Sequence, residues 1–439
     1  MNSRFCFRLV SWRAPFLLTS LLLLPALAQA NWPAWRGPHG NGVSPVTELP
    51  VEWSPTKNIR WRVDLPDPGN STPIVWGDQI FVTQAVEQDH FRGVLSFDAR
   101  TGKHLWTKGT TFAGEEPTHG DNPYCAASPV TDGKTVVATH GSAGIFAYDF
   151  SGQELWQRDL GPQVHTWGNA SSPVILGDRV FIYHGPGTNS AFYSLNLKNG
   201  ETIWRVALPE PVPGERTDGF AGRGPGIIGS FSTPALTKID GREQLVISLP
   251  EFLHGFDPVT GREVWRCGGL NPLVYTSPVI HDGHVLALGG FMGSGMLVKP
   301  AGTGDITASA RVWHEQRARK GRIGSSVIKD GLVFFINQDG IAECLELATG
   351  KQVWLERLPV KGAKGDSGSS ALLAGDRVYF VNQAGETHVV RASRNYEVLA
   401  SNALGEHTNS SLVVSGKDLL LRTYKGLWCI SGETQTAAR

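Results

Sequence analysis

The chain has 439 residues and carries 40 basic and 40 acidic side chains, so its formal net charge is zero. Charged residues make up only 18% of the chain and form no basic cluster, which excludes the nucleic-acid-binding proteins that depend on one. The 52 glycines and 27 prolines separate strong apolar segments, a composition that predicts a turn-rich all-β protein rather than a disordered one.

The first thirty residues have the features of an export signal. Arg4, Arg8 and Arg13 precede an apolar run (15–28), which the small residues of AQA (28–30) follow. This order predicts a signal peptide over residues 1–30, cleaved after Ala30, and a periplasmic or secreted protein. The run is short and interrupted by proline, so we expect no membrane span after cleavage. Residues 31–56 follow as an N-terminal segment.

A serine-rich mark recurs eight times in the rest of the chain. Each mark precedes a turn and an apolar strand, as in AGDRVYFVN (374–382), and Gly-Asp between alternating apolar residues is a strong hairpin signal. In chain order the marks are STPIV (71–75), ASPVT (127–131), SSPVI (171–175), STPAL (232–236), TSPVI (276–280), SSVIK (325–329), SSALL (369–373) and SSLVV (410–414).

A second motif places a tryptophan shortly after a Thr-Gly turn, as in ARTGKHLW (99–106). We expect the glycine to adopt a positive φ and the tryptophan to wedge between neighbouring sheets. The units end at Trp106, Trp156, Trp204, Trp265, Trp313 and Trp354, with Leu399 in place of the seventh tryptophan.

The two motifs together define one unit of four antiparallel strands. Four strands in roughly 45 residues are the size of a β-propeller blade. The eighth unit reaches the C-terminus without its fourth strand, and NIRWRVDL (58–65), which contains Trp61, supplies a strand before the first mark. The sequence therefore predicts one eight-bladed β-propeller over residues 57–431, its last blade closed by the N-terminal strand, and a C-terminal tail over 432–439.

These repeats resemble those of the PQQ-repeat, or quinoprotein alcohol dehydrogenase-like, β-propellers. The resemblance covers about residues 57–431, and the opening NWPAWRGPHGNGVS (31–44) is similar to secreted PQQ-like propellers of planctomycete-type bacteria. That superfamily includes PQQ-dependent dehydrogenases and non-catalytic propellers, among them the periplasmic scaffold lipoprotein of the outer-membrane β-barrel assembly machine. The resemblance therefore implies a fold and leaves the function open.

Three functions remain. The expected one is an exported, monomeric, non-catalytic module that binds a ligand or an envelope protein. The alternatives are a PQQ-dependent oxidoreductase and a carbohydrate- or polymer-acting enzyme on a propeller scaffold. The superfamily's dehydrogenases use a vicinal cysteine pair and calcium, and this chain has no such pair. We therefore expect no cofactor, with PQQ and calcium only under the oxidoreductase alternative.

Polar residues gather before the serine-rich marks, in loops that lead from one blade into the next. In a propeller these loops open on one face around the central funnel, where converging polar groups form a binding site. The alternative is that these side chains hydrogen-bond to loop backbones and water, and that Trp167 is a packing residue rather than a ligand contact. The candidates are His119, Asp121, His165, Trp167, Asn169, Arg322, Lys364, Asp366, His407 and Asn409.

Three further features concern the same loops and the core. The two longest entry loops, 107–126 and 205–231, are rich in glycine and proline and share the predicted rim. GDSGS (365–369) looks like a protease nucleophile loop, but Ser367 precedes a mark and has no protease-like partners. The cysteines show no metal- or haem-binding spacing, so no metal site is expected, and Cys344 and Cys429 are interpreted as core residues.

Overall fold

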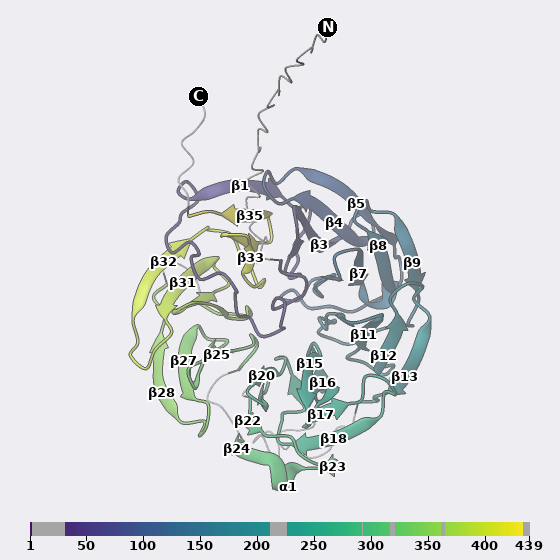
Figure 1. The fold of residues 1–439 in the computed structure, drawn as a ribbon, viewed down its shortest axis with the longest axis vertical. Coiled ribbons are helices and arrows are strands. Elements are labelled where there is room, and N and C mark those ends of the chain that lie inside the picture. The colour runs from purple at the N-terminus through teal and green to yellow at the C-terminus, as the bar shows by residue number, and fades with distance from the viewer. Residues whose placement is uncertain (2–30, 211–225, 292, 317–320, 361–364, 433–439) are drawn as a thin grey trace.

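Eight sheets stand around a central axis like the blades of a propeller (Figure 1); seven have four strands, and the fourth along the chain carries a short fifth strand that pairs parallel at its rim. The computed structural model describes Met1 and residues 31–432, except 211–225, 292, 317–320 and 361–364. Within these residues the four repeating strands of every blade are antiparallel, with the first at the axis and the fourth at the rim. The predicted all-β, eight-bladed fold is confirmed.

The blades follow one another in chain order. Blades one to four are β2(Ile74–Trp76), β3(Gln79–Val86), β4(Phe91–Asp98) and β5(His104–Thr111); β6(Val130–Thr131), β7(Thr135–Thr139), β8(Ile145–Asp149) and β9(Glu154–Arg158); β10(Val174–Leu176), β11(Arg179–His184), β12(Ala191–Asn196) and β13(Thr202–Ala207); β15(Ala235–Ile239), β16(Arg242–Leu249), β17(Phe252–Phe256) and β18(Glu263–Gly268). Blades five to seven are β20(Val279–His281), β21(His284–Leu288), β22(Gly295–Val298) and β24(Arg311–Glu315); β25(Val327–Lys329), β26(Leu332–Ile336), β27(Ile341–Glu346) and β28(Gln352–Arg357); β29(Leu372–Ala374), β30(Arg377–Val381), β31(Glu386–Arg391) and β32(Val398–Ala403).

Blade eight combines the two ends of the chain. It consists of β33(Val413–Ser415), β34(Asp418–Arg422), β35(Gly426–Ile430) and β1(Ile59–Asp64). Strand β1 pairs antiparallel with β35, with Trp61 opposite Cys429. The predicted closure by the N-terminal strand is therefore confirmed, and it leaves no gap in the circle of blades.

The serine-rich marks form a closed ring of hydrogen bonds around the axis. In each blade, the backbone N–H of one mark residue donates to the side-chain hydroxyl at the same position of the next blade. The eighth blade donates back to the first, and the eight N to O distances lie between 2.7 and 3.2 Å. The ring residues are Thr72, Ser128, Ser172, Thr233, Ser277, Ser325, Ser370 and Ser411. In the sixth blade the mark therefore begins one residue earlier than SSVIK, at Gly324.

The repeat tryptophans join neighbouring blades at the rim. The Trp106 ring of blade one covers Gly152 in the Ser-Gly turn of blade two, so closely that a Cβ at Gly152 would lie 2.8 Å from the ring. Its Nε1 donates to the carbonyl of Phe150 at 2.9 Å. Gly152 has a φ of +84°, which glycine adopts without a Cβ clash. The same indole-to-carbonyl bond recurs at Trp61, Trp156, Trp204, Trp313 and Trp354.

Two blade junctions depart from this pattern. Trp265 is buried between blades four and five, but its Nε1 donates to Gln244 within its own blade. Blade five offers no Thr-Gly turn there, because β23(Gly304–Asp305) and α1(Thr307–Ala310) replace it and β23 pairs with β18. At the junction of blades seven and eight, Leu399 packs against a cluster that includes Trp53 of the N-terminal segment.

The N-terminal segment crosses the axis before it reaches β1 (Figure 1). We call residues 31–44 the strap. The carbonyl of Pro33 accepts from Thr131 of blade two at 2.9 Å, whereas Arg36 donates to the carbonyls of Ser325, at 3.1 Å, and Ser326 in blade six. Blades two and six lie on opposite sides of the ring, so the strap spans the central channel and closes it.

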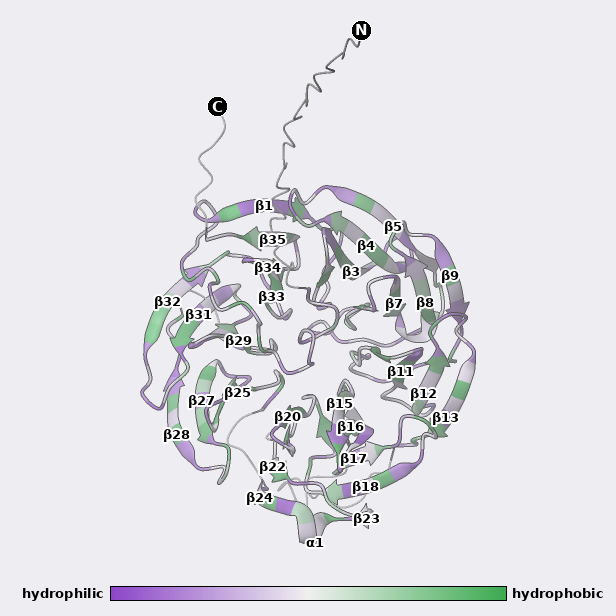
Figure 2. Ribbon diagram, viewed as in Figure 1, coloured by the Kyte–Doolittle hydropathy of each residue, from purple (hydrophilic) through white to green (hydrophobic). Residues whose placement is uncertain are grey.

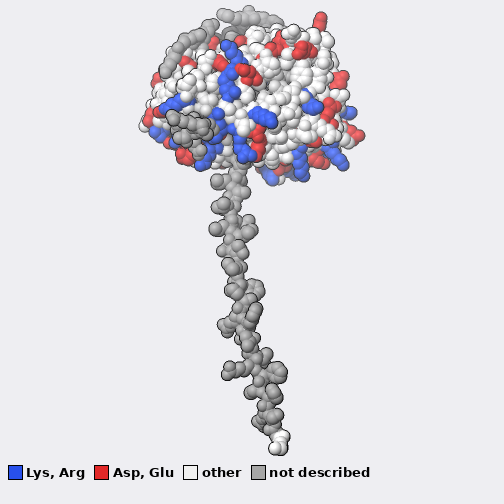
Figure 3. All heavy atoms as spheres, turned by 90° about the horizontal axis from the view of Figure 1, so that it is seen from above, with Lys and Arg blue, Asp and Glu red and all other residues white. Residues whose placement is uncertain are grey.

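Within a blade, the inner strands are more hydrophobic than the rim strand (Figure 2). Second and third strands, such as β3 and β4, are buried along nearly their whole length, whereas β5 at the rim is largely exposed. The outer surface carries basic and acidic side chains interspersed, as the side of the disc in Figure 3 shows. The core therefore lies between adjacent blades, and the rim is a mixed polar surface.

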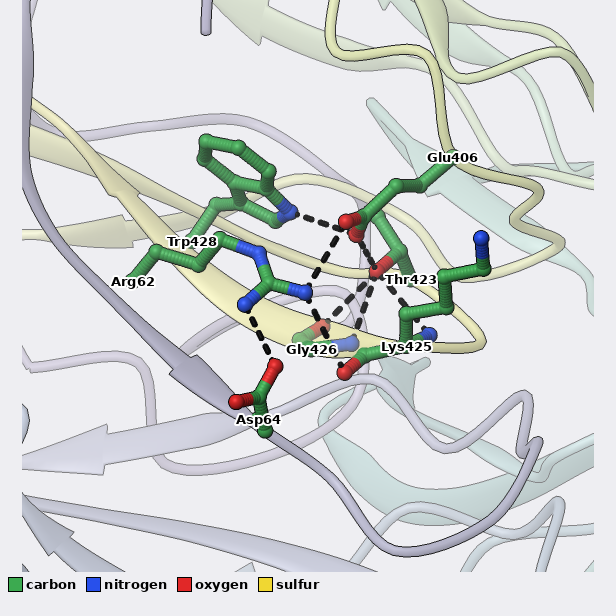
Figure 4. Close-up of polar contacts among 7 residues, drawn as sticks. All are labelled: Arg62, Asp64, Glu406, Thr423, Lys425, Gly426 and Trp428. Carbon is green, nitrogen blue, oxygen red and sulfur yellow. Dashed lines mark hydrogen bonds and ion pairs between the residues drawn. The ribbon is translucent and has the colours of Figure 1, made fainter.

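A polar latch holds the N-terminal strand in blade eight (Figure 4). Arg62 of β1 donates to Glu406 at 2.9 Å and to Asp64 at 2.5 Å. The other Glu406 carboxylate oxygen accepts from Thr423 and from the Trp428 indole. Burial opposes ionisation of Glu406, but these hydrogen bonds outweigh it and hold the pKa of Glu406 below its ordinary value.

Removing one hydroxyl from the ring should weaken the whole fold. Ser172→Ala leaves the N–H of Ser128 buried without an acceptor, which should lower the free energy of unfolding by about 1–3 kcal/mol. Urea unfolding followed by tryptophan fluorescence measures the loss. Ser172→Thr is the matched control, because threonine serves at ring positions 72 and 233. A Ser172→Ala protein as stable as its parent would contradict the role of the ring.

The latch should contribute a pH-dependent part of the stability. Because folding lowers the pKa of Glu406, its contribution is present above the ordinary carboxyl pKa and is lost as the pH falls through the folded-state value. Glu406→Gln should cost about 1–3 kcal/mol near neutral pH, and the difference from the parent should shrink in acid. The exposed pair Glu52–Lys57 supplies the control, since Glu52→Gln should change little. A Glu406→Gln deficit that persists unchanged at low pH would contradict the latch.

Candidate functional site

The two faces of the propeller differ in their loops. The entry face carries the loops that lead from a fourth strand into the next blade, together with the turns between second and third strands. The turn face carries the Gly-Asp and Thr-Gly turns. The 107–126 loop therefore shares the entry face with the funnel, as the strand order requires, and so do the described ends of the 205–231 loop, whose residues 211–225 lie outside the described residues.

A cup of about 510 Å³ opens on the entry face. Its volume lies within the range of small-molecule sites. Six hydroxyls of the serine ring surround it near its base, namely Thr72, Ser128, Ser172, Thr233, Ser370 and Ser411. Higher up lie six amides, namely Asn70, Asn122, Asn271, Gln338, Gln383 and Asn409. Five aromatic side chains complete the lining, namely Trp35, Trp167, Phe231, Tyr275 and Phe291.

The strap provides the floor of the cup through Trp35. The next residue, Arg36, is buried, and its guanidinium donates to backbone carbonyls of Asn41 and Ser325 at 2.7 and 3.1 Å. Burial lowers the pKa of Arg36 to about 9, so it remains charged near neutral pH. These bonds fix Trp35 in the channel, and the cup is blind rather than a through-pore.

The polar side of the cup belongs to blades seven, eight, one and two. Asn70 and Asn409 both donate to the carbonyl of Asp121, at 2.8 and 3.1 Å. The neighbouring Asn122 donates to the carbonyl of Trp167 at 2.7 Å. The 107–126 loop is thus anchored to blades one, three and eight, and it brings Asp121 to the cup.

The apolar side chains of the cup belong mainly to blades three to six, where the amides of Asn271 and Gln338 also lie. The Phe231 and Tyr275 rings lie 5.6 Å apart, and Trp167 stacks against His119 with their centroids 3.9 Å apart. Ile227 and Phe291 are 42% and 47% exposed, unusually high for side chains of their size. Exposed apolar side chains grouped beside polar ones are typical of a binding surface.

Several predicted site residues lie at the cup. Asp121, Trp167 and Asn409 line it. His119 stacks behind Trp167, and His407 packs edge-on against Tyr424, 4.4 Å between centroids. Burial lowers the pKa of His407, and the Asp121 carboxylate opposes this shift. The two histidines are therefore neighbours of the cup rather than part of its lining.

Other predicted site residues serve the loops, as the alternative interpretation held. The His165 imidazole lies between the carbonyl of Ile228, at 3.0 Å, and the N–H of Trp167, at 3.1 Å. Burial lowers the pKa of His165. Asn169 donates to the Glu116 carboxylate at 3.0 Å. These contacts hold the wall of the cup without facing a ligand.

Two charged candidates also stand apart from the cup. Arg322 is 2% exposed and bonds Glu315 at 2.9 Å and the Ser294 carbonyl at 3.3 Å, between blades five and six. Asp366 does not line the cup, although its carbonyl accepts from the Gln383 N–H. Lys364 lies outside the described residues. Of the predicted residues that the structure describes, Asp121, Trp167 and Asn409 therefore line the cup, and other amides, hydroxyls and aromatic rings supply most of the remaining lining.

Sequence reasoning missed the strap and most of the amides. Asn70 and Asn409 each stand two residues before a ring residue, so their spacing repeats. Gln338 and Gln383 occur in NQDG (337–340) and NQAG (382–385), at the same turn of blades six and seven. These repeats carried a signal for the amides, whereas nothing periodic marks Trp35.

The protease-like GDSGS sequence has a structural role. Ser367 is buried, and its hydroxyl donates to the Val381 carbonyl at 2.6 Å. Ser230 and Thr408, at the same repeat position, donate to strand carbonyls in their own blades at the same distance. Ser367 is thus a repeat feature. Cys344 and Cys429 are buried and unpaired, in cores between blades.

Two features are absent from the described residues. No group of three or more His, Cys, Asp or Glu in the part of the chain that the structure describes could hold a metal ion. No described helix is long and apolar enough to cross a membrane.

Comparison with known proteins places this geometry in a family. BamB from Moraxella catarrhalis superposes with a TM-score of 0.58 at 15% identity, covering 85% of this chain and 99% of that one. The computationally designed Ika8 protein gives 0.55 at 11% identity, covering 84% and 98%. At these identities the likeness shows the fold alone.

The match to a curated relative covers only about half of that relative's length. The tetrathionate hydrolase of Acidithiobacillus ferrooxidans is 24% identical over 302 residues, which are 66% of this chain and 54% of that protein. The chain thus spans about half the length of the curated relative it matches. A family model described as outer membrane protein assembly factor BamB matches residues 47–204 and 188–439, nearly all of the propeller. The resemblance to PQQ-repeat propellers is confirmed, and the chain belongs to the family described as outer membrane protein assembly factor BamB.

Proposed function

We propose that this protein is an exported, non-catalytic propeller that binds a small neutral ligand, or the end of a neutral chain, in the entry-face cup. The observation that carries the proposal is the cup itself, a blind cavity lined by amides, hydroxyls and aromatic rings. Such a lining fixes the orientation of a ligand through a few polar groups while apolar walls cover its faces.

The chemistry of the lining supports binding rather than catalysis. Among the lining residues that the structure describes, Asp121 is the only acidic or basic one. Hydrolysis of a glycosidic bond ordinarily uses two carboxyl groups, and acyl transfer needs a nucleophile with an adjacent base. Neither pair is present in this part of the lining, and burial raises the pKa of Tyr275 to about 12, so its phenol stays protonated.

PQQ and calcium, the cofactors of the oxidoreductase alternative, do not fit the described residues. PQQ carries three carboxylates, and no lysine or arginine is among the described lining residues to pair with them. The chain has no vicinal cysteine pair, and no described cluster of acidic or histidine side chains offers a calcium site. The residues therefore favour a ligand without several negative charges.

The wider setting of the function follows from the N-terminus and the family. The signal peptide predicted over residues 1–30 would export the protein to the periplasm or beyond. BamB, by its name, is an assembly factor for outer membrane proteins. We propose by analogy that an envelope protein could present the ligand, with a segment of that protein or a group attached to it entering the cup.

Ligand binding by variants of the cup can be compared with ligand binding by a variant of the turn face. A library of neutral hydroxylated and amide fragments, screened by ligand-observed NMR, should give hits that Phe291→Ala and Gln338→Ala weaken at least about tenfold, which corresponds to 1.4 kcal/mol. Phe291 and Gln338 line the cup on different blades.

The matched control is Val259→Ala, which truncates an exposed apolar side chain, 63% exposed, in a turn of the opposite face. It should leave every hit unchanged. An absence of hits, or hits that resist both cup variants, would overturn the proposal.

A further inference from the structure

We infer that the ligand is a carbohydrate, bound as a free sugar or as the end of a glycan chain. This inference rests on the proposed binding function and adds the chemical class of the ligand. It is carried by hydroxyls at the base of the cup that have hydrogen atoms left to donate, by the amides of its lining, and by the separation of an amide-rich from an aromatic wall.

Three polar atoms on cup residues lack a hydrogen-bond partner and are shielded from bulk water. They are Asn271 Nδ2, Trp167 Nε1 and Asn70 Oδ1. Backbone contacts fix both amide orientations, because Asn271 Oδ1 accepts from the N–H of Ser294 and Asn70 Nδ2 donates to the carbonyl of Asp121. A water molecule does not reach these three atoms, so a ligand in the cup contacts other lining groups, such as the ring hydroxyls and the Gln338 and Gln383 amides.

The serine ring adds donors at the base of the cup. Each of its six lining hydroxyls accepts a backbone N–H from the preceding blade, which leaves the O–H hydrogen for another acceptor. None of these six hydroxyls donates to a protein acceptor among the hydrogen bonds of the described residues. A ligand that reaches the base therefore needs several oxygen acceptors in a compact arrangement.

A hydroxyl group suits both the ring hydroxyls and the amides, because it donates and accepts at the same time. A carboxylate or phosphate would bring negative charge into a lining whose single acidic or basic residue, among those described, is Asp121. An ammonium group only donates, so it would leave the ring hydroxyls without an acceptor. Mixed donors and acceptors with a single charged group in the described lining thus favour a neutral polyol.

The two walls of the cup match the two surfaces of a sugar ring. A pyranose carries hydroxyls around its edge and C–H groups on its faces. Amides such as Gln383 and Asn409 stand on the side of blades seven to two, whereas Phe231, Tyr275 and Phe291 stand on the side of blades four and five. The aromatic rings can cover an apolar face while the amides bind the edge.

The closed floor selects the end of a chain. Trp35 blocks the channel below the base, so a polymer cannot thread through. A peptide is less well matched, because extended peptides add to a free strand edge through their backbone. Here the N–H groups of the innermost mark residues, such as Ser172 and Thr233, are already used in the ring.

Titration calorimetry with named sugars tests the inference. The probes are glucose, N-acetylglucosamine, maltose and cellobiose, with glucose 6-phosphate as the charged counterpart. At least one neutral sugar should bind, at least about tenfold more tightly than glucose 6-phosphate, and Phe291→Ala and Gln338→Ala should each weaken it about tenfold or more. Val259→Ala on the turn face should leave the affinity unchanged.

The outcomes separate this inference from the proposed function. If neutral fragments bind at the cup but no sugar does, or if a capped-peptide library binds there instead, the carbohydrate inference is wrong and the binding cup stands. Tighter binding of glucose 6-phosphate than of glucose would also overturn the inference. If neither fragments nor sugars bind, both proposals fail. Sugar binding that ignores Phe291→Ala and Gln338→Ala would place the site elsewhere and overturn the inference.

Discussion

The ring of eight hydrogen bonds at the axis is the constraint on which the rest of the structure depends. Each blade both donates an N–H and accepts one at a hydroxyl, so every blade must supply serine or threonine at the same position, and the eighth must bond the first. The tryptophans repeat this neighbour-to-neighbour contact at the rim, where six of the eight blades have an indole that donates to a carbonyl of the next blade. Inner and outer connections together fix the angle between blades, and hence the number that closes the circle.

The same ring sets the size and chemistry of the cup. Because its oxygens accept from the backbone, its hydroxyl hydrogens remain for a ligand at the one place where all eight blades converge. The alternative use of the axis, as an open channel, is prevented by the strap. Arg36 holds it there through backbone carbonyls of blade six, an arrangement that compensates a buried cation by hydrogen bonds rather than by a carboxylate.

Periodicity explains what the sequence could and could not predict. The fold was readable because the ring hydroxyls recur in every repeat, and the turn glycines such as Gly152 and the docking tryptophans recur in most of them. The site was only partly readable. Asp121, Trp167 and Asn409 were predicted at the cup because they precede a serine-rich mark, and they do line it. Arg322 and His165 also precede a mark, but their side chains contact a blade and a loop instead. The direction in which a loop side chain points depends on the local backbone geometry, which the spacing of residues in the sequence does not reveal.

The segments that differ from the repeat give the cup of this propeller its asymmetry. Trp35 comes from outside the repeats, the 107–126 loop reaches across to blades one, three and eight, and Phe291 stands exposed beside the cup. A perfectly repeating propeller would present eight equal walls, which suit a symmetric ligand. Here one half of the cup is amide-rich and the other aromatic, so any ligand must be bound in one orientation. The strap and the entry loops therefore change what the cup can recognise while the ring beneath them remains intact.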